Sequence, residues 1–225
     1  MEQSTQQVKK NAKGITIGLL ISVTLFLLVV FVFWRITDEI VLEKEGSFDA
    51  VVFKALEGYT TSATTKIMLL FTFFGSTKFL LPAYILLTGF LFFKRSGFWS
   101  ASVASIGLSS IGLLFLLKNI FHRHRPLETL TQNVIGYSYP SGHSFSSFTF
   151  FGLLTYLIWQ TELSKIWKWI LSVVFITLAV CIALSRVYLH VHFASDVVAG
   201  FCLSIIWLFI CFWVLNTIRK KWNFK

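Results

Sequence analysis

The chain has 225 residues, of which 56% are hydrophobic, 17% are aromatic and only 13% are charged. Soluble domains usually contain about 25% charged residues, so the composition excludes an ordinary water-soluble protein and indicates an integral membrane protein. The formal net charge of +10 does not indicate nucleic-acid binding, because half of the basic residues flank apolar runs and the rest form no basic stripe; anionic lipid is the expected counterpart.

The first apolar run covers residues 14–34, between Lys13 and Arg35. About 20 helical residues cross a hydrocarbon core of roughly 30 Å, so this run is long enough to span a bilayer. It is longer than the apolar region of a signal peptide, and no small-residue cleavage site follows it. We therefore expect it to remain in the protein as an anchor.

The second apolar run, residues 67–93, is too long for one straight crossing. It is interrupted by three residues: Gly75, Lys78 and Pro82. We expect residues 67–74 to form a short surface-lying or re-entrant piece and residues 77–93 to form the second span.

Four further uncharged runs approach or exceed the spanning length: 96–117, 144–161, 169–185 and 197–218. Together with the first two they give six predicted transmembrane helices, and no repeat or shift in composition divides the chain. The predicted fold class is an all-α integral membrane protein with six transmembrane helices, forming a single domain over residues 1–225.

Lysine and arginine are unevenly distributed between the loops, and short cytoplasmic loops carry an excess of them. They precede the first span, lie in the loops between spans two and three and between spans four and five, and follow span six: Lys9, Lys10, Lys13, Lys94, Arg95, Lys165, Lys168, Arg219, Lys220 and Lys221. Six spans put these on one side, so both termini are predicted to be cytoplasmic, with residues 1–13 as a tail. The acidic segment 35–66 falls on the opposite side, where we expect a short amphipathic helical segment.

Three polar clusters lie at the ends of the apolar runs, and the predicted topology puts all of them on the outer side. They are Lys118 with Arg125 and Pro126, then Pro140-Ser141-Gly142-His143, then Ser185 and Arg186 with His192 and Asp196. Together they supply three cations, two imidazoles, one carboxylate and a Gly-containing helix start. These groups can hold a phosphate and attack its phosphorus, so the clusters predict a phosphatase site at the membrane surface.

The cations meet the electrostatic needs of phosphate-ester hydrolysis. Anionic phosphoryl oxygens repel a nucleophile, so catalysis requires positive charges aimed at those oxygens and a leaving group that can be protonated. Lys118, Arg125 and Arg186 would supply the charges. Any one of them alone is as well explained by a side chain that extends from a span end to the interface.

The segment 140–143 immediately precedes the run 144–161. A helix N-terminus binds anions through its unpaired N–H groups, and Gly142 allows the backbone to approach a ligand closely. Ser141 is also a good N-cap, so a capped helix start is the simpler alternative. His143 favours a phosphate site, because an imidazole in this turn can give a proton to the departing oxygen.

His192 and Asp196 are four residues apart, so they share one face if a helix begins near them. The carboxylate can then accept the proton of one ring nitrogen and leave the other nitrogen as a nucleophile. Arg186 would point away from His192 on a continuous helix. We therefore expect a loop between them that folds Arg186 back toward the phosphate.

Two alternatives remain open from the residues alone. A metal site is the first, with imidazole and carboxylate ligands from His190, His192 and Asp196, or from His122 and His124. Three cations around a metal ion would be electrostatically poor, which argues against it. A small transporter or channel is the second, although spans five and six are almost wholly apolar between their ends.

The chain resembles the type 2 phosphatidic acid phosphatase family, and within it the bacterial membrane enzymes related to phosphatidylglycerophosphatase B. Three ordered motifs in its second half carry the resemblance: KNIFHRHRP at 118–126, PSGH at 140–143 and SRVYLHVHFASD at 185–196. All key positions and spacings match. His190 and Ala194 depart from the pattern, because many relatives have a small residue and a proline there.

The resemblance implies a six-helix core and a mechanism that needs neither metal nor cofactor. It implies that His192 is the nucleophile that forms a phosphohistidine, that Asp196 orients it, and that His143 is first the acid and then the base. The implied phosphate-binding residues are Lys118, Arg125, Ser141, Gly142 and Arg186. Spacing alone does not decide which histidine attacks.

A lipid phosphate is the expected substrate, because clusters at the headgroup level reach a phosphate whose tails stay in the bilayer. The resemblance points first to phosphatidylglycerophosphate. The alternatives are undecaprenyl diphosphate, followed by phosphatidic acid, diacylglycerol pyrophosphate and sphingoid phosphates. We expect a multi-pass protein of the cell membrane with an extracytoplasmic site, no nucleic-acid partner and no obligate protein partner.

Overall fold

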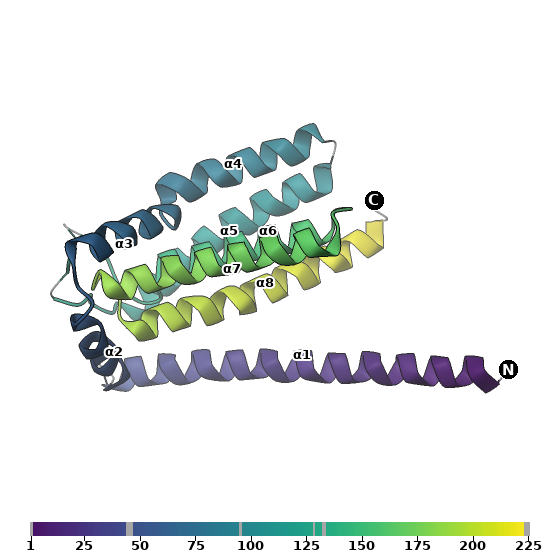
Figure 1. The fold of residues 1–225 in the computed structure, drawn as a ribbon, viewed down its shortest axis with the longest axis horizontal. Helices are drawn as coiled ribbons and strands as arrows, with labels where there is room; N and C mark the ends of the chain where they lie inside the picture. Colours follow the sequence, from purple (N-terminus) through teal and green to yellow (C-terminus); the bar gives the residue numbers. More distant parts are fainter. Residues whose placement is uncertain (1, 44–46, 95, 128, 132–133, 223–225) are drawn as a thin grey trace.

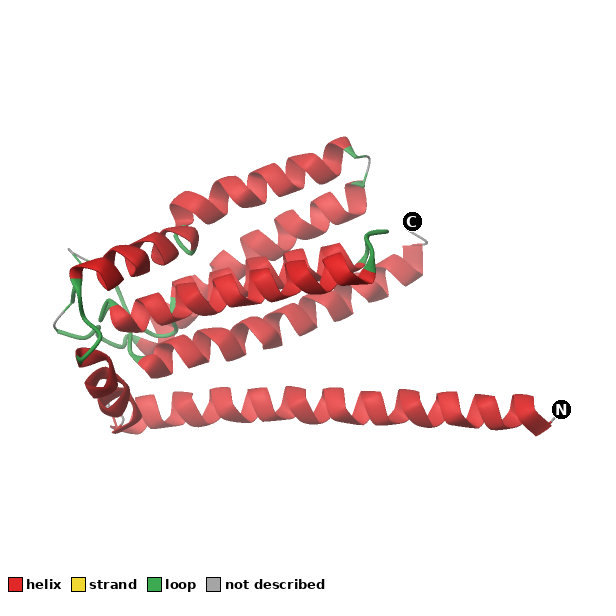
Figure 2. Ribbon diagram, in the orientation of Figure 1, coloured by secondary structure: helices red, strands yellow, loops and turns green. Residues whose placement is uncertain are grey.

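A computed structural model describes residues 2–43, 47–94, 96–127, 129–131 and 134–222 of the chain (Figure 1). Within these residues all regular secondary structure is α-helical (Figure 2). The helices are α1 (Glu2–Glu43), α2 (Ser47–Glu57), α3 (Ser62–Phe74), α4 (Thr77–Phe93), α5 (Gly97–Phe121), α6 (Gly142–Trp159), α7 (Lys165–Tyr188) and α8 (Ala194–Trp222).

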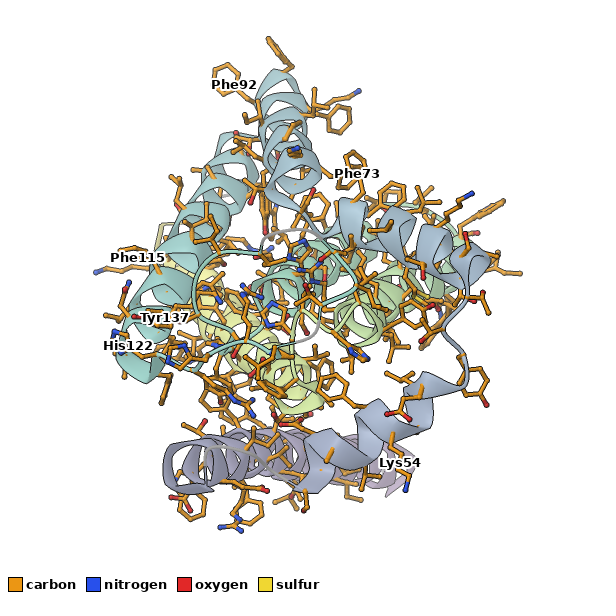
Figure 3. All side chains as sticks on the ribbon, turned by 90° about the vertical axis from the view of Figure 1, so that its left-hand side faces the viewer. Lys54, Phe73, Phe92, Phe115, His122 and Tyr137 are labelled. Atoms are coloured by element: carbon orange, nitrogen blue, oxygen red, sulfur yellow. The ribbon has the colours of Figure 1, made fainter. Side chains whose placement is uncertain are left out.

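Five helical stretches of the described residues are long and apolar enough to cross a bilayer: Leu19–Glu39, Ser62–Phe93, Gly97–Phe121, Lys165–Tyr188 and Ala194–Lys221. They overlap five of the six predicted spans. Large apolar side chains cover their outer surfaces, and Phe73, Phe92 and Phe115 point away from the bundle (Figure 3). Such surfaces are stable against lipid tails, so the chain is an all-helical, multi-pass membrane protein.

The predicted span at 144–161 forms α6, which is not among these five stretches. Its first turns carry buried polar side chains, including Ser144, Ser147 and Thr149. They face protein rather than lipid, because α6 packs against both α7 and α8 in the middle of the bundle. A sixth crossing therefore stays a prediction.

Helix α1 continues beyond the predicted end of the first span at residue 34. The Thr37 hydroxyl donates to the Phe33 carbonyl at 2.7 Å and lies 2.6 Å from the Tyr139 hydroxyl. The segment expected outside the first span therefore begins with the last turns of α1, which reach the loop before α6. Along the bundle α1 packs on α8, where the rings of Phe26 and Phe209 are 4.4 Å apart.

The second apolar run is divided at Gly75, as its length predicts, and α4 has the predicted bounds of the second span. A Cβ atom at Gly75 would overlap the Ile182 side chain of α7, so glycine allows α3 and α7 to pack closely here. Helix α3 begins at Ser62 rather than at residue 67, because the Thr61 side chain caps it by accepting from the Thr64 N–H at 3.1 Å. Whether residues 67–74 are re-entrant stays a prediction.

The ends of four helices lie together at one end of the bundle, on the left of Figure 1. Helices α5 and α7 end there, α6 and α8 begin there, and α2 lies across this end. The start of α1 and the end of α8 lie at the opposite end. This agrees with two termini on one side of the membrane, and the cytoplasmic identity of that side stays a prediction.

Candidate active site

The three polar clusters meet at this end of the bundle. Figure 3 looks onto it and shows nitrogen-bearing side chains between the helix ends. Lys118 Nζ donates to the Tyr137 carbonyl at 2.6 Å, and Arg125 donates to the same carbonyl at 3.3 Å and to the Gly136 carbonyl at 2.9 Å. Gly136 has a φ of 90°, which glycine adopts readily, so the loop before α6 can turn back toward both cations.

His192 lies between a carboxylate and a guanidinium group. Its Nδ1 is 3.3 Å from Asp196 Oδ2, and its Nε2 is 3.2 Å from Arg125 Nη1. Because a guanidinium only donates hydrogen bonds, Nε2 is the acceptor, and the proton of the neutral ring is on Nδ1, which donates it to Asp196. The lone pair of Nε2 therefore faces the cations, as a nucleophilic histidine requires.

Asp196 is held by the start of α8. Its Oδ2 accepts a hydrogen bond from the Phe193 N–H at 3.0 Å, just before the helix begins at Ala194. A carboxylate in the first turn that bonds back to the preceding N–H is half of a capping box, and its negative charge is favourable at a helix N-terminus. The same residue therefore caps α8 and orients His192, and its side chain is fully buried.

A loop separates Arg186 from His192, as the spacing predicts. Helix α7 ends at Tyr188, and the N–H groups of Val191 and His192 donate to the Arg186 carbonyl at 3.2 and 3.3 Å. The Arg186 side chain is buried and donates to the Thr72 hydroxyl of α3. Its Nε has no hydrogen-bond partner among the described residues.

The start of α6 has the geometry of a capped helix. The Ser141 side chain accepts from the Ser144 N–H at 3.4 Å, and the Ser141 N–H donates to the Asp196 carbonyl at 3.0 Å. This is the simpler of the two functions weighed for Ser141, and phosphate binding by it stays a prediction. Gly142 lies beside a cation, because a Cβ atom there would be 3.9 Å from Lys118 Cε.

His143 lies in the first turn of α6, beside the break between α3 and α4. Its ring Cδ2 would be 3.2 Å from a Cβ atom at Gly75. Burial lowers the pKa of His143 well below its usual 6.5, and neighbouring groups lower it further: Arg186 most strongly, then His192, Arg125 and Lys118. All three predicted cations thus act on one imidazole.

Burial also lowers the pKa of His192, from 6.5 to about 4. The Asp196 carboxylate opposes this effect, whereas the charges of Arg125 and Arg186 add to it. His192 is therefore neutral near pH 7, which is the protonation state of a nucleophile.

Sequence reasoning missed two buried residues beside the site. Arg123 donates to Asp196 Oδ1 at 2.6 Å and to Asp49 Oδ2 at 2.8 Å, and its guanidinium lies 4.0 Å over the Phe193 ring. Asp49 comes from α2 and accepts from the Ser195 N–H at 2.8 Å. The only sequence signal for Arg123 was its place two residues before Arg125, and Asp49 had none beyond its charge.

Two histidines of the alternative metal sites pack against aromatic rings. The His190 ring packs against the Phe53 ring at 4.7 Å, and the His122 ring packs against the Tyr137 ring at 4.5 Å (Figure 3). In the described part of the chain, no group of three His, Cys, Asp or Glu side chains is arranged to hold a metal ion.

A cavity of about 760 Å³ opens beside His143. It lies between α4, α5 and α6, and it extends from Gly142 and His143 to Phe92 and Phe93 near the other end of α4. Its wall is mainly apolar: Leu80, Leu81, Tyr84, Ile85, Phe92, Phe93, Ala104, Leu108, Ile111 and Leu114 contribute to it. The polar site and the apolar cavity thus meet at the imidazole of His143.

Known proteins resemble the chain in sequence and in fold. The chain is 29% identical over 167 residues to phosphatidylglycerophosphatase B of Bacillus subtilis, covering 73% of this chain and 81% of that protein. It is 28% identical over 168 residues to an undecaprenyl-diphosphatase of Sulfolobus acidocaldarius, covering 72% and 76%. The crystal structure of a transmembrane PAP2 type phosphatidylglycerolphosphate phosphatase from Bacillus subtilis superposes with a TM-score of 0.78 at 26% identity, covering 86% of this chain and 96% of that one. Residues 98–220, which include all three motifs, match the PAP2 superfamily, and the chain belongs to this family.

Proposed function

We propose that the chain is a lipid phosphate phosphatase in which His192 attacks phosphorus. The observation that carries this proposal is the position of His192, with Nδ1 held by Asp196 and Nε2 facing Arg125. The similarity to a phosphatidylglycerophosphatase and to an undecaprenyl-diphosphatase supports it.

In the first step, the lone pair of His192 Nε2 forms a bond to phosphorus while the bond from phosphorus to the lipid oxygen breaks. His143 gives its proton to that oxygen, so the lipid leaves as an alcohol. Lys118, Arg125 and Arg186 neutralise the phosphoryl oxygens, with the start of α6 at Ser141 and Gly142 as further donors. Arg125 exchanges its bond to Nε2 for bonds to the substrate.

In the second step, water attacks the phosphohistidine and the nitrogen–phosphorus bond breaks. His143, now neutral, takes a proton from the water and is ready for the next cycle. Inorganic phosphate is released and His192 returns to its neutral form. In this scheme the cations and the start of α6 stabilise the phosphoryl charge, and no metal ion takes part.

The protonation state of His143 follows from the charges around it. In the free site, burial and the charges of three cations hold the pKa of its ring well below 6.5. A phosphate dianion compensates those cations and raises the pKa of the ring again. Anion binding therefore favours the protonated form of the acid.

The preferred substrate in this proposal is phosphatidylglycerophosphate, with undecaprenyl diphosphate as the second candidate. The apolar cavity beside His143 supports a substrate with hydrocarbon tails, because tails placed there bring a terminal phosphate to the site. We place the site on the extracytoplasmic side of the cell membrane, because the basic loops lie at the other end of the helices.

The test is phosphate release from phosphatidylglycerophosphate and from undecaprenyl diphosphate by the purified protein in detergent with a chelator. We expect hydrolysis with the chelator present, and loss of hydrolysis in His192→Ala. Incubation with ³²P-labelled substrate followed by an alkaline quench should trap an acid-labile phosphoenzyme in the wild type only. Activity that disappears with the chelator, or that persists in His192→Ala, would contradict the mechanism.

A further inference from the structure

Asp196 makes a second buried contact, on the side away from His192. Its Oδ2 faces His192 and the Phe193 N–H, whereas its Oδ1 accepts from Arg123 Nη1 at 2.6 Å. Both oxygens of the carboxylate are thus bonded. A rotation that would take Oδ2 away from His192 breaks the bond to Arg123.

Arg123 is itself held from a third direction. Its Nη2 donates to Asp49 Oδ2 at 2.8 Å, and its Nη1 donates to Ser195 Oγ at 2.8 Å. The guanidinium lies 4.0 Å over the Phe193 ring, which fixes its plane. The side chains of Arg123 and Asp49 are only 7% and 5% exposed, so water competes little for these contacts.

Asp49 also fastens α2 to the start of α8. Its Oδ1 accepts from the Ser195 N–H at 2.8 Å, and its Oδ2 lies 2.7 Å from Ser195 Oγ. A carboxylate from another element therefore satisfies one of the N–H groups that a helix start leaves unpaired. The contacts run in an unbroken series from α2 through Arg123 and Asp196 to His192.

We infer that Arg123 and Asp49 are positioning residues for the reaction, holding Asp196 so that the Nδ1–H of His192 stays directed at its carboxylate. This inference rests on the proposed function of His192. Neither residue lies against the phosphate in this arrangement, since Asp196 and Phe193 stand between Arg123 and the imidazole. Loss of either should lower kcat much more than it changes KM.

The charges of this series give a readout that misfolding does not produce. Asp49, Arg123 and Asp196 together carry a formal charge of −1. Arg123→Gln changes the sum to −2, which favours the protonated form of His192, and adding Asp49→Asn returns the sum to −1. Both variants lack the guanidinium, so they share its structural loss and differ only at residue 49, where asparagine removes the charge.

Other charged groups near His192 stay constant in this comparison. Apart from Asp196, they come from α5, the loop before α6, α6 and α7: Lys118, Arg125, His143 and Arg186. The acidic limb of the kcat profile reports protonation of a base in the enzyme–substrate complex. A more negative charge sum should therefore move this limb to higher pH.

The experiment measures kcat and KM for a lipid phosphate between about pH 4 and pH 8 in wild type, Asp49→Asn, Arg123→Gln and the double variant. We expect Asp49→Asn to lower kcat about tenfold with little change in KM, since small displacements of a catalytic group have effects of this size or larger. The acidic limb of Arg123→Gln should lie about one pH unit above that of the double variant. Arg123→Lys should keep the wild-type limb with a reduced kcat, because the charge remains.

The matched control is the exposed ion pair of Arg35 and Asp38 on α1, in which Arg35 Nη1 lies 3.4 Å from Asp38 Oδ2. Arg35→Gln and Asp38→Asn should leave kcat and its pH profile unchanged. If Arg123→Gln does not fold, Asp49→Asn and Arg123→Lys carry the test. The inference would be overturned if kcat stayed within twofold of wild type in Asp49→Asn and in Arg123→Lys and if the acidic limbs of Arg123→Gln and the double variant coincided. His192→Ala separates the two proposals, because its activity bears on the proposed function alone.

Discussion

At the scale of single residues, the two histidines of the proposed active site differ in what surrounds them. His192 has a hydrogen-bond partner at each ring nitrogen, a carboxylate on one side and a guanidinium on the other. The strongest charges acting on His143 are cationic. A ring held by a carboxylate is suited to attack, and a ring whose proton affinity depends on a bound anion is suited to transfer a proton.

His143→Ala should separate substrates by their leaving groups. Hydrolysis of an alkyl phosphate should fall by about 10²- to 10⁴-fold, the usual contribution of general acid catalysis, because the alkoxide then leaves without a proton. An aryl phosphate with a good leaving group should lose much less in its first step. The measurement is the rate of the first turnover on both substrates by rapid quench, and equal losses would mean that His143 is not the acid.

Anion binding should be coupled to proton uptake at His143. Its pKa lies well below 6.5 in the free site, so near pH 6.5 the ring is neutral, and a bound dianion should raise the pKa and draw in a proton. Tungstate should therefore bind more tightly as the pH falls from about 8 to 6. Calorimetry in two buffers of different ionisation enthalpy should detect uptake of up to one proton. His143→Asn should abolish this uptake, and unchanged uptake in that variant would assign the proton to another group.

The motifs in the sequence were sufficient to predict residues that are close in the chain, but not contacts between distant ones. His192 and Asp196 share a helix start, so their spacing indicates their contact. Asp49 and Arg123 are 74 positions apart in the chain. They meet only because α2 lies across the end of the bundle. Nothing in the acidic composition of residues 35–66 distinguishes Asp49 from its neighbours, so only the fold could reveal it.

At the scale of helices, the site depends on a close approach of α6 and α8. A Cβ atom at Gly200 of α8 would lie 2.8 Å from the Ser141 carbonyl oxygen and 3.1 Å from the Phe145 nitrogen. Both are backbone atoms at the start of α6, which cannot move aside as a flexible side chain can. Glycine at this position therefore sets the distance between the two helix starts that carry His143 and Asp196.

Gly200→Ala should move α8 away from α6. We expect a loss of about 1–3 kcal/mol of stability, the usual cost of forcing an extra carbon into a packed interface, together with reduced turnover. The comparison is Gly112→Ala in α5, where a Cβ atom would meet nothing within 4 Å and the alanine should keep or raise stability. Thermal unfolding in detergent measures the stability of both variants. An unchanged transition in Gly200→Ala would mean that the helices have room to adjust.

Hydropathy predicted where helices would form better than where they would end. The bounds of α4 follow from Gly75 and the charged residues after Phe93, whereas α1 continues past residue 34 because Thr37 bonds to the loop before α6. The apolar pattern also predicts α6 as a span, and its crossing of the membrane stays a prediction. The extension of α1 depends on a tertiary contact, which composition does not contain.

At the scale of the whole molecule, the polar site and the apolar cavity form one continuous feature. The cations and imidazoles lie where the helices end, and the cavity extends from His143 between α4 and α5 along the bundle. A lipid whose tails occupy the cavity would present its phosphate to His192 without leaving the bilayer. This arrangement favours amphiphilic substrates over soluble phosphates of the same chemistry.

Narrowing the cavity should therefore affect lipids selectively. Ala104 lines it on α5, away from the cations, so Ala104→Phe should raise KM for a long-chain lipid phosphate by about tenfold or more while a short soluble phosphate keeps its kcat/KM. Leu116→Phe is the control, because Leu116 is exposed on the same helix outside the cavity. Turnover of both substrates in detergent micelles gives the comparison. Equal effects of Ala104→Phe on both would show that the tails bind elsewhere, and equal effects of the two variants on the lipid would point to a general disturbance of α5.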